Sequence, residues 1–225
     1  MKVLAVVAHP DDEVIGVGGT LARHAARGDE VTVVILAEGK SSRKPRYEPL
    51  AEDVRRAAHA ETEEAGRVLG LAALHRHDLP DNRLDSLDLL DLVKLVAGHV
   101  GEVAPEVVYT HHGGDLSIDH QRVHRAVMTA TRPLPGCPVK WVFAFETASS
   151  TEWNFREGDA FQANYFVDIG AHLERKMAAM AAYRSELHEP PHPRSLAAIE
   201  RNARTWGSRC GLAAAEAFRV VRGLW

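Results

Sequence analysis

Residues 8–13 read Ala-His-Pro-Asp-Asp-Glu and follow directly on the apolar run Val3–Val7. A histidine and adjacent carboxylates at the end of a buried strand are residue types that bind a divalent cation and activate water. His9 and Asp12 are three residues apart and could bind one ion together, whereas Asp11 would point elsewhere and remain available as a base. An imidazole and a carboxylate suit Zn²⁺ or a similar first-row metal. The hexapeptide therefore predicts a hydrolytic metal site.

A second group of histidines and carboxylates, residues 111–120, follows another apolar run at 106–110. A catalytic zinc site needs a third protein ligand and an open position for water. We predict that His120 is this ligand and that Asp119 orients a ring or holds a water. His124, one helical turn further on, is expected to face solvent or to pack. Each motif alone also fits a helix cap or a turn, and only the two together favour a metal.

The remaining sequence supplies the elements that must position these loops. Short apolar runs predict strands at 3–7, 31–36, 74–78, 106–110, 140–146 and 165–169. Amphipathic stretches predict helices at 18–27, 51–69, 85–100, 171–184, 195–205 and 211–219. This alternation predicts an α/β fold with a doubly wound, mostly parallel, Rossmann-like sheet and helices on both faces. No linker divides the chain, so we expect residues 1–225 to form a single domain.

Charge and composition narrow the functional classes. The 27 basic and 31 acidic residues give a net charge of −4 and form no basic block, which argues against a nucleic-acid partner. No apolar run approaches the roughly 20 residues that span a bilayer, and no signal peptide is recognisable. Cys137 and Cys210 fit neither a disulfide framework nor a zinc-binding spacing. We expect a cytoplasmic protein with unpaired thiols and no membrane span.

Two motifs together resemble a known family. Ala-His-Pro-Asp-Asp-Glu at 8–13, combined with Asp-Leu-Ser-Ile-Asp-His at 115–120, is similar to the LmbE-like or PIG-L family of zinc-dependent N-deacetylases. Residues 79–82, 191–195 and 215–218 also resemble that family. The resemblance extends over nearly the whole chain, and the first two motifs are its most specific part.

The resemblance implies that His9, Asp12 and His120 bind the metal, that Asp11 is the general base, and that Asp119 lies close to the metal. It implies hydrolysis of the N-acetyl amide of an N-acetylglucosamine-type amino-sugar derivative, with release of acetate and a free amine. The implied ion is Zn²⁺, although two imidazoles and a carboxylate also suit Fe²⁺ or another divalent first-row metal. Relatives often assemble from several subunits, so a homo-oligomer is a further expectation.

One position departs from the family pattern. Many relatives carry a second histidine three residues before the last ligand, where this chain has Ser117. The group that protonates the leaving amine is therefore open, with Asp11, His111, His112 and His192 as candidates. Two other functions remain as alternatives: an amidase that cleaves a larger acyl group, and a non-catalytic nucleotide-binding domain. The glycines at 16–19 do not form a phosphate-binding pattern, which weakens the second alternative.

Substrate contacts are less clearly marked. Arg43, Lys44 and Arg46 follow the second predicted strand, and Arg194 lies in a proline-rich stretch. These cations could meet a phosphate of the substrate or could be solvated. The hydroxyl- and aromatic-rich segment 146–155 could form a sugar-binding wall or an oligomer contact.

Overall fold

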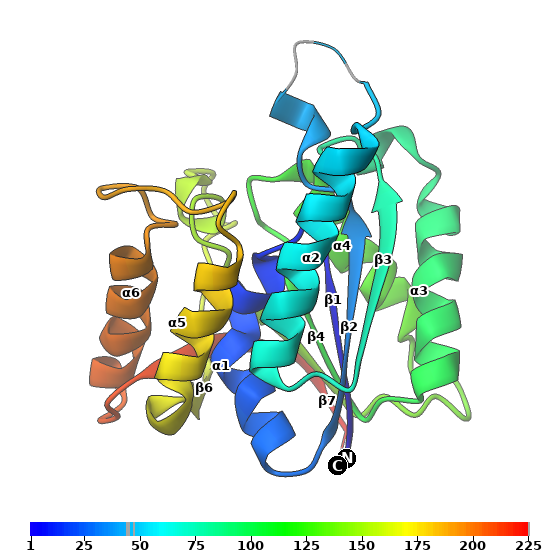
Figure 1. The fold of residues 1–225 in the computed structure, drawn as a ribbon. Coiled ribbons are helices and arrows are strands. Elements are labelled where there is room, and N and C mark those ends of the chain that lie inside the picture. Colours follow the sequence, from blue (N-terminus) through cyan, green and yellow to red (C-terminus); the bar gives the residue numbers. More distant parts are fainter. Residues whose placement is uncertain (44–45, 47, 225) are drawn as a thin grey trace.

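The computed structural model describes residues 1–43, 46 and 48–224, without the side chain of Arg43. These residues form one seven-stranded sheet between two layers of helices (Figure 1). The strands are β1 (Lys2–Val7), β2 (Glu30–Ala37), β3 (Ala73–Leu79), β4 (Val107–His111), β5 (Trp141–Phe145), β6 (Tyr165–Asp168) and β7 (Ala215–Gly223). The helices are α1 (Asp12–Ala26), α2 (Glu52–Leu69), α3 (Leu89–Val103), α4 (Ile118–Ala130), α5 (Leu173–Ala182) and α6 (Leu196–Arg209).

The strand order is β3-β2-β1-β4-β5-β7-β6. The first five strands in this order pair in parallel, and β7 pairs antiparallel with both β5 and β6. From β1 the chain proceeds to β2 and β3 on one side, then returns to β4 on the other side. The predicted doubly wound, mostly parallel α/β sheet is therefore confirmed.

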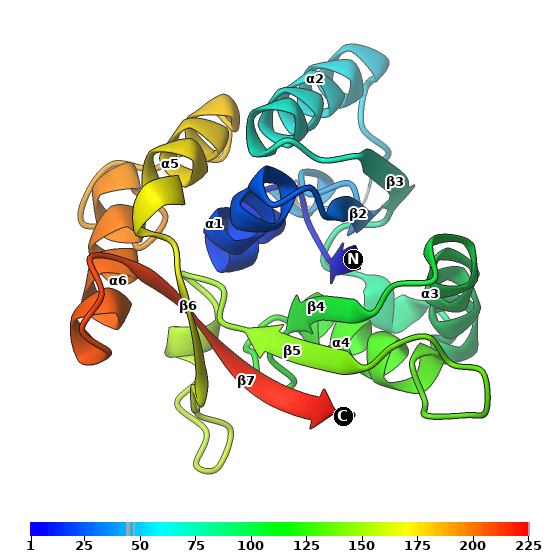
Figure 2. The same cartoon turned by 90° about the horizontal axis from the view of Figure 1, so that it is seen from below.

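The central strand β1 is buried on both faces, as its uninterrupted apolar sequence predicts. Val3, Ala5 and Val7 pack into a core that is shared with α1, α2, α5 and α6. The intervening Leu4 and Val6 pack into a second core with α3 and α4. Figure 2 shows these two helical layers on opposite sides of the sheet.

The start of the first helix differs from the prediction. The sequence placed a helix at 18–27, but α1 begins at Asp12 and ends at Ala26. The glycines within α1 serve close packing instead of opening the helix. A Cβ atom at Gly16 would overlap the ring of Phe145, so only glycine lets β5 approach the helix this closely. The acidic motif thus forms the first helical turn.

The predicted helix at 211–219 was wrong, because this region contributes to strand β7. Alanine and glutamate at 213–217 favour a helix locally, but pairing with β5 on one side and β6 on the other overrides that preference. Phe218 of β7 is fully buried in the core, and it pairs with Phe145 of β5 on one side and with Tyr165 of β6 on the other.

Among the described residues, no helix combines the length and the apolar character that crossing a bilayer requires.

The position of Phe218 in β7, between β5 and β6, gives a stability prediction. Replacement Phe218→Ala leaves a cavity in the main core and is expected to lower the free energy of unfolding by about 3–5 kcal/mol, measured by urea denaturation. Val221→Ala is the control on the same strand: Val221 is 39% exposed, and the change should cost less than about 1 kcal/mol. Equal losses for the two variants would contradict the assignment of β7.

Candidate metal centre and active-site cavity

The topology brings the two sequence motifs together. β1 and β4 are adjacent parallel strands, and they flank the point where the chain reverses its direction of travel across the sheet. The loop 8–11 and the loop 112–117 therefore leave the same edge. In open α/β sheets this crevice at the carboxyl ends of the strands is where ligands bind.

The loop between β1 and α1 is tightly fixed. The backbone N–H of His9 donates to Asp12 Oδ2 at 2.8 Å, which draws the carboxylate back over the loop. Asp11 has a φ of 94°, in the left-handed region that non-glycine residues rarely adopt. Asp12 and Glu13 occupy the buried first turn of α1, where the helix dipole favours negative charge. The left-handed backbone conformation of Asp11 thus lets the chain pass directly from the loop after β1 into α1, at a cost in strain.

The imidazoles of His9 and His120 and the carboxylate of Asp12 meet in one group of ligand-type atoms, which is called the metal group below. Asp12 Oδ2 lies 3.3 Å from His9 Nδ1 and 3.3 Å from His120 Nε2, and the two nitrogens are 3.3 Å apart. The three atoms form a nearly equilateral triangle. A tetrahedral ion with ligands at about 2.0–2.1 Å has edges of about 3.3–3.4 Å between its ligands. The donor types and their spacing therefore fit a zinc ion.

Further carboxylates surround the far sides of both rings. His9 Nε2 lies 3.1 Å from Asp119 Oδ2 and 3.2 Å from Asp81 Oδ1, and these three residues form a second group of ligand-type atoms. His120 Nδ1 lies 3.2 Å from Asp115 Oδ1, an ion-pair contact without hydrogen-bond geometry. Carboxylates in these positions orient metal-binding imidazoles and raise their basicity.

The electrostatics of this group favour positive charge. Burial alone would lower the pKa of both imidazoles, but hydrogen bonds to Asp119 and Asp12 hold the pKa of His9 well above its usual range. Asp12 and Asp115 likewise overcome burial and raise the pKa of His120 to about 9. Burial would raise the pKa of Asp12, yet the charge of His120 holds it well below its usual range. The carboxylates around His9 and His120 therefore stabilise positive charge, which is the charge that a divalent cation carries.

Asp11 is only 2% exposed and, like His9, Asp12 and His120, it lines the open cavity described below. Its Oδ2 accepts a hydrogen bond from Arg194 Nη1 at 3.2 Å, and Glu186 Oε2 lies 3.8 Å from the same nitrogen. Burial and the charge of Asp12 raise the pKa of the Asp11 carboxyl well above its usual range, and Arg194 opposes this shift. A carboxyl group with a raised pKa is suited to accept a proton. Arg194 therefore contacts two carboxylates of the protein.

His111 belongs to the site but is fixed as a neutral ring. Its Nε2 accepts the Ala8 backbone N–H at 2.9 Å, which leaves the ring proton on Nδ1, 3.1 Å from Thr147 Oγ1. Burial and the charge of His120 lower its pKa well below the usual range. Ser117, at the position where relatives carry a histidine, caps α4 by accepting the backbone N–H of His120.

Three other histidines make contacts outside the metal group. His112 Nε2 lies 2.8 Å from the Asp159 carbonyl oxygen. His192 stacks on His188 with ring centroids 3.9 Å apart. His124 Nδ1 lies 2.8 Å from the carbonyl oxygen at the end of β4, so this ring packs as expected.

An open cavity of about 640 Å³ gives access to the metal group. It is lined by His9, Pro10, Asp11, Asp12, Gly39, Ser42, Asp81, Asn82, Leu116, Ser117, Ile118, His120, Thr147, Ala148, Ser149, Ser150, Trp153, Glu186 and Arg194. Trp153 is 42% exposed and offers a ring to this space. The segment 146–155 thus forms part of the cavity wall. Lys44 and the side chain of Arg43 lie outside the described residues, and Arg46 is exposed.

Sequence reasoning missed Asp81 and Asp115, although both carried a signal. Asp81 lies in the Leu79–Asn82 turn, which resembled the family but received no role. Asp115 follows two glycines in the loop that leads into the helix of His120. Its carboxylate accepts hydrogen bonds from Ser117 N at 2.9 Å and from Thr151 Oγ1 at 2.5 Å. It therefore ties the loop after β4 to the loop after β5.

The buried carboxylate of Asp115 gives a pH-dependent stability prediction. Burial would raise its pKa, but His120 and two hydroxyl groups lower it to about 2. The ionised form therefore adds about 2 kcal/mol to stability above about pH 5, and about half of this is lost near pH 3. Urea denaturation of chelator-treated protein should show the difference between wild type and Asp115→Asn shrinking over this range. Asp85→Asn, at an exposed carboxylate, should show no such trend.

Comparisons with known proteins show what this chain is similar to. The PIG-L family, described as GlcNAc-PI de-N-acetylase, matches residues 4–131. A 1D-myo-inositol 2-acetamido-2-deoxy-alpha-D-glucopyranoside deacetylase from Tsukamurella paurometabola is 30% identical over 251 residues, covering 84% of each chain. The solved structure of the conserved protein TT1542 from Thermus thermophilus is 26% identical with a TM-score of 0.78, covering 100% of this chain and 96% of that one.

The fold is also shared with a protein of different chemistry. The structure of GalB, a 4-carboxy-2-hydroxymuconate hydratase from Pseudomonas putida KT2440, has a TM-score of 0.79 at 23% identity and covers 100% of this chain and 98% of that chain. The reaction must therefore be argued from the site and from the closer sequence relatives. The family match spans more than half of the chain and contains both strand-end motifs, so this protein belongs to the PIG-L family.

Proposed function

We propose that this protein is a metal-dependent N-deacetylase of an N-acetylglucosamine-type amino-sugar derivative, releasing acetate and a free amine. The observation that carries the proposal is the triangle of His9, Asp12 and His120 at the edge of an open cavity that Asp11 also lines. The activities named for the family and for the Tsukamurella relative support this choice of reaction.

We assign His9, Asp12 and His120 as the metal ligands, with Zn²⁺ as the ion. Two imidazole nitrogens and one carboxylate oxygen leave a position open for water, which distinguishes a catalytic from a structural zinc site. A bound zinc ion supplies Lewis acidity, lowering the pKa of water and stabilising negative charge on an amide oxygen. The same donors also suit Fe²⁺ or another divalent first-row metal, and the zinc assignment is part of the proposal.

Asp11 is proposed as the general base. Arg194 holds Oδ2, and Oδ1 receives no hydrogen bond from any described residue, so Oδ1 is the oxygen that takes a proton from water. The raised pKa of this carboxyl makes it competent to bind that proton. Arg194 fixes the orientation of the carboxylate throughout.

The leaving nitrogen must gain a proton before it departs as an amine. We propose that Asp11 returns the proton that it accepted from water, so one water is consumed for each acetate and amine produced. His111 is less suited to this step because its Nε2 lone pair already accepts the Ala8 N–H. His112 and His192 are bonded or stacked elsewhere.

The substrate is proposed to lie with its sugar ring against Trp153, since aromatic rings in open cavities provide apolar faces for sugars. Leu116 and Ile118 are 52% and 40% exposed and line the same cavity, so part of this wall is apolar. The single domain over residues 1–225 is supported by one sheet that contains strands from both ends of the chain. The homo-oligomer and the cytoplasmic location stay predictions.

The base assignment predicts the effect of an isosteric change. Asp11→Asn removes the proton acceptor and should lower kcat by about 10²–10⁴-fold, while the zinc content of the purified protein stays near wild type. Turnover is measured as acetate release, and metal as zinc per chain. Asp53→Asn, at an exposed carboxylate of α2, should change neither quantity. Unchanged turnover in Asp11→Asn would exclude Asp11 as the base.

The ligand assignment predicts loss of the metal itself. His120→Ala removes one of the three donors and should weaken zinc affinity at least about tenfold, measured by competition with a chromogenic chelator. His112→Ala is the matched control, because its ring contacts the Asp159 carbonyl oxygen and does not belong to the group of ligand-type atoms. Equal zinc affinity in wild type and His120→Ala would remove His120 from the ligand set.

The acyl group of the substrate separates the proposed reaction from its closest alternative. Zinc-loaded protein is assayed with glucosamine derivatives whose N-acyl chain grows from acetyl to butyryl and octanoyl. A deacetylase should release acetate fastest, since a longer chain must find extra space beside the metal group. Faster release of the longer acids would favour the larger-acyl amidase, and no hydrolysis of any member would contradict the proposal.

A further inference from the structure

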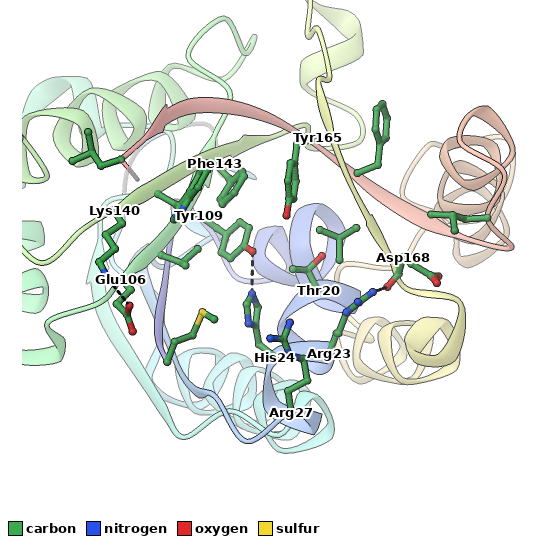
Figure 3. A pocket seen from close by; sticks show the side chains of 17 residues that line it. Thr20, Arg23, His24, Arg27, Glu106, Tyr109, Lys140, Phe143, Tyr165 and Asp168 are labelled. Atoms are coloured by element: carbon green, nitrogen blue, oxygen red, sulfur yellow. Dashed lines mark hydrogen bonds and ion pairs between the residues drawn. The ribbon is translucent and has the colours of Figure 1, made fainter.

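A second cavity, of about 740 Å³, lies at the opposite end of the sheet from the metal group. Met1, Val107 and Trp141 mark it as the end where β1, β4 and β5 begin, and the carboxyl half of α1 forms its other wall. Its lining shares no residue with the candidate active site. Figure 3 shows this space with its side chains.

Aromatic side chains form one continuous wall. Phe143 stacks on Tyr109 with ring centroids 5.3 Å apart and on Trp141 with centroids 5.9 Å apart. Tyr165 continues the row 4.9 Å from Phe143 and is 43% exposed, and the neighbouring Phe166 is 36% exposed. Rings packed in this way offer an apolar surface on which a flat ligand can stack.

A polar stripe of α1 faces this wall. Thr20, Arg23, His24 and Arg27 are spaced at i, i+3, i+4 and i+7, so they share one side of the helix and its end. Figure 3 shows all four around the same space. The concave shape, the apolar wall and a few convergent polar groups are the usual features of a small-molecule site.

The hydroxyl of Thr20 makes no hydrogen bond within the part of the chain that the structure describes. Thr20 is 1% exposed and lines the cavity, yet its Oγ1 makes no hydrogen bond with any described residue. Buried polar groups in native proteins are normally bonded, because an unmet hydroxyl is costly. A ligand with an acceptor atom at this point would satisfy it.

The rest of the polar stripe is held in place. His24 Nδ1 lies 2.7 Å from Asp29 Oδ2, and His24 Nε2 lies 3.0 Å from the Tyr109 hydroxyl. Asp29 also accepts the amino group of Met1 at 2.8 Å. This chain of contacts fixes the ring of His24 and the phenol of Tyr109, so the polar wall is ordered before a ligand arrives.

Only part of the positive charge that lines this second cavity is paired with a carboxylate. Lys140 pairs with Glu106 at 3.1 Å, whereas Arg23 donates to the backbone carbonyl of Asp168. The exposed guanidinium of Arg27 forms no hydrogen bond or ion pair with any residue that the structure describes. The carboxylate of Asp168 also lines the space and accepts Gly170 N–H. Among the described residues, no carboxylate contacts the guanidinium of Arg23 or of Arg27, and this favours an anionic ligand.

We propose that this cavity binds a small aromatic carboxylate. Its ring lies along the row of Tyr109, Phe143 and Tyr165, and its carboxylate is met by Arg27 and the Thr20 hydroxyl. The proposal is independent of the deacetylase reaction, because the two cavities lie at opposite ends of the sheet.

Titration calorimetry with the full chain tests the proposal. The probe is 2-naphthoate, and 2-naphthamide is the neutral compound of the same shape. We expect 2-naphthoate to bind and the amide to bind at least about tenfold more weakly, because charge-assisted hydrogen bonds to guanidinium are lost. Quenching of tryptophan fluorescence is a second readout, since Trp141 lines the cavity.

Two variants locate the binding site. Arg27→Gln and Thr20→Val should each raise the Kd for 2-naphthoate by about tenfold. Arg201→Gln, which removes an exposed guanidinium of α6 far from the cavity, is the matched control and should leave the Kd unchanged. Thermal unfolding of all three variants near the wild-type midpoint shows that the fold is intact.

Several results would overturn the proposal. These are no binding of 2-naphthoate at about millimolar concentration, equal affinity for the amide, or a Kd that neither Arg27→Gln nor Thr20→Val changes. Light scattering tests whether a second copy of the chain occupies the cavity instead. The aromatic wall is an interface between copies if the chains associate, if Tyr165→Arg dissociates them, and if 2-naphthoate does not bind.

Discussion

Buried negative charge is the constraint around which this site is built. Asp11, Asp12, Asp81, Asp115 and Asp119 are each at most 3% exposed, and all lie in or directly behind one cavity wall. Buried carboxylates persist only when cations or hydrogen-bond donors compensate them, because desolvation of an unpaired charge is costly. Each of them contacts an imidazole, a guanidinium, a hydroxyl or a backbone N–H of the protein. The remaining deficit of positive charge lies at the triangle of ligand-type atoms, where a divalent ion fits.

The sheet topology allows this charge to be collected from distant parts of the sequence. Because β1 and β4 pair in parallel next to each other, the loops that follow them meet at one edge. The Ala8 N–H bonded to His111 links the two loops at their base. Asp115 then binds hydroxyl groups of the loop after β5. Three strand ends are thereby held around the same cavity, which preserves the spacing of the ligand-type atoms of His9, Asp12 and His120.

Helix α1 connects two regions of different chemistry. Its first turn carries Asp12 and Glu13 into the acidic site, and its last two turns present a partly cationic stripe to the aromatic cavity. Between them, Gly16 permits close contact with Phe145 and thereby fixes the helix against the sheet. The hydratase with the same fold shows that such a scaffold accommodates more than one reaction, so the residues at the strand ends decide the chemistry.

The sequence by itself determined the α/β class and the central strands, because these depend on local patterns of apolar runs. It also marked His9, Asp12 and His120 as candidate metal ligands by residue type and spacing. It did not determine that 211–219 contributes to a strand or that α1 begins at Asp12, since tertiary pairing and close packing override local propensity. Only the tertiary structure decided that Asp115 lies behind His120 and that Arg194 holds Asp11. These contacts join residues from separate loops, and sequence patterns carry no direct information about such distances.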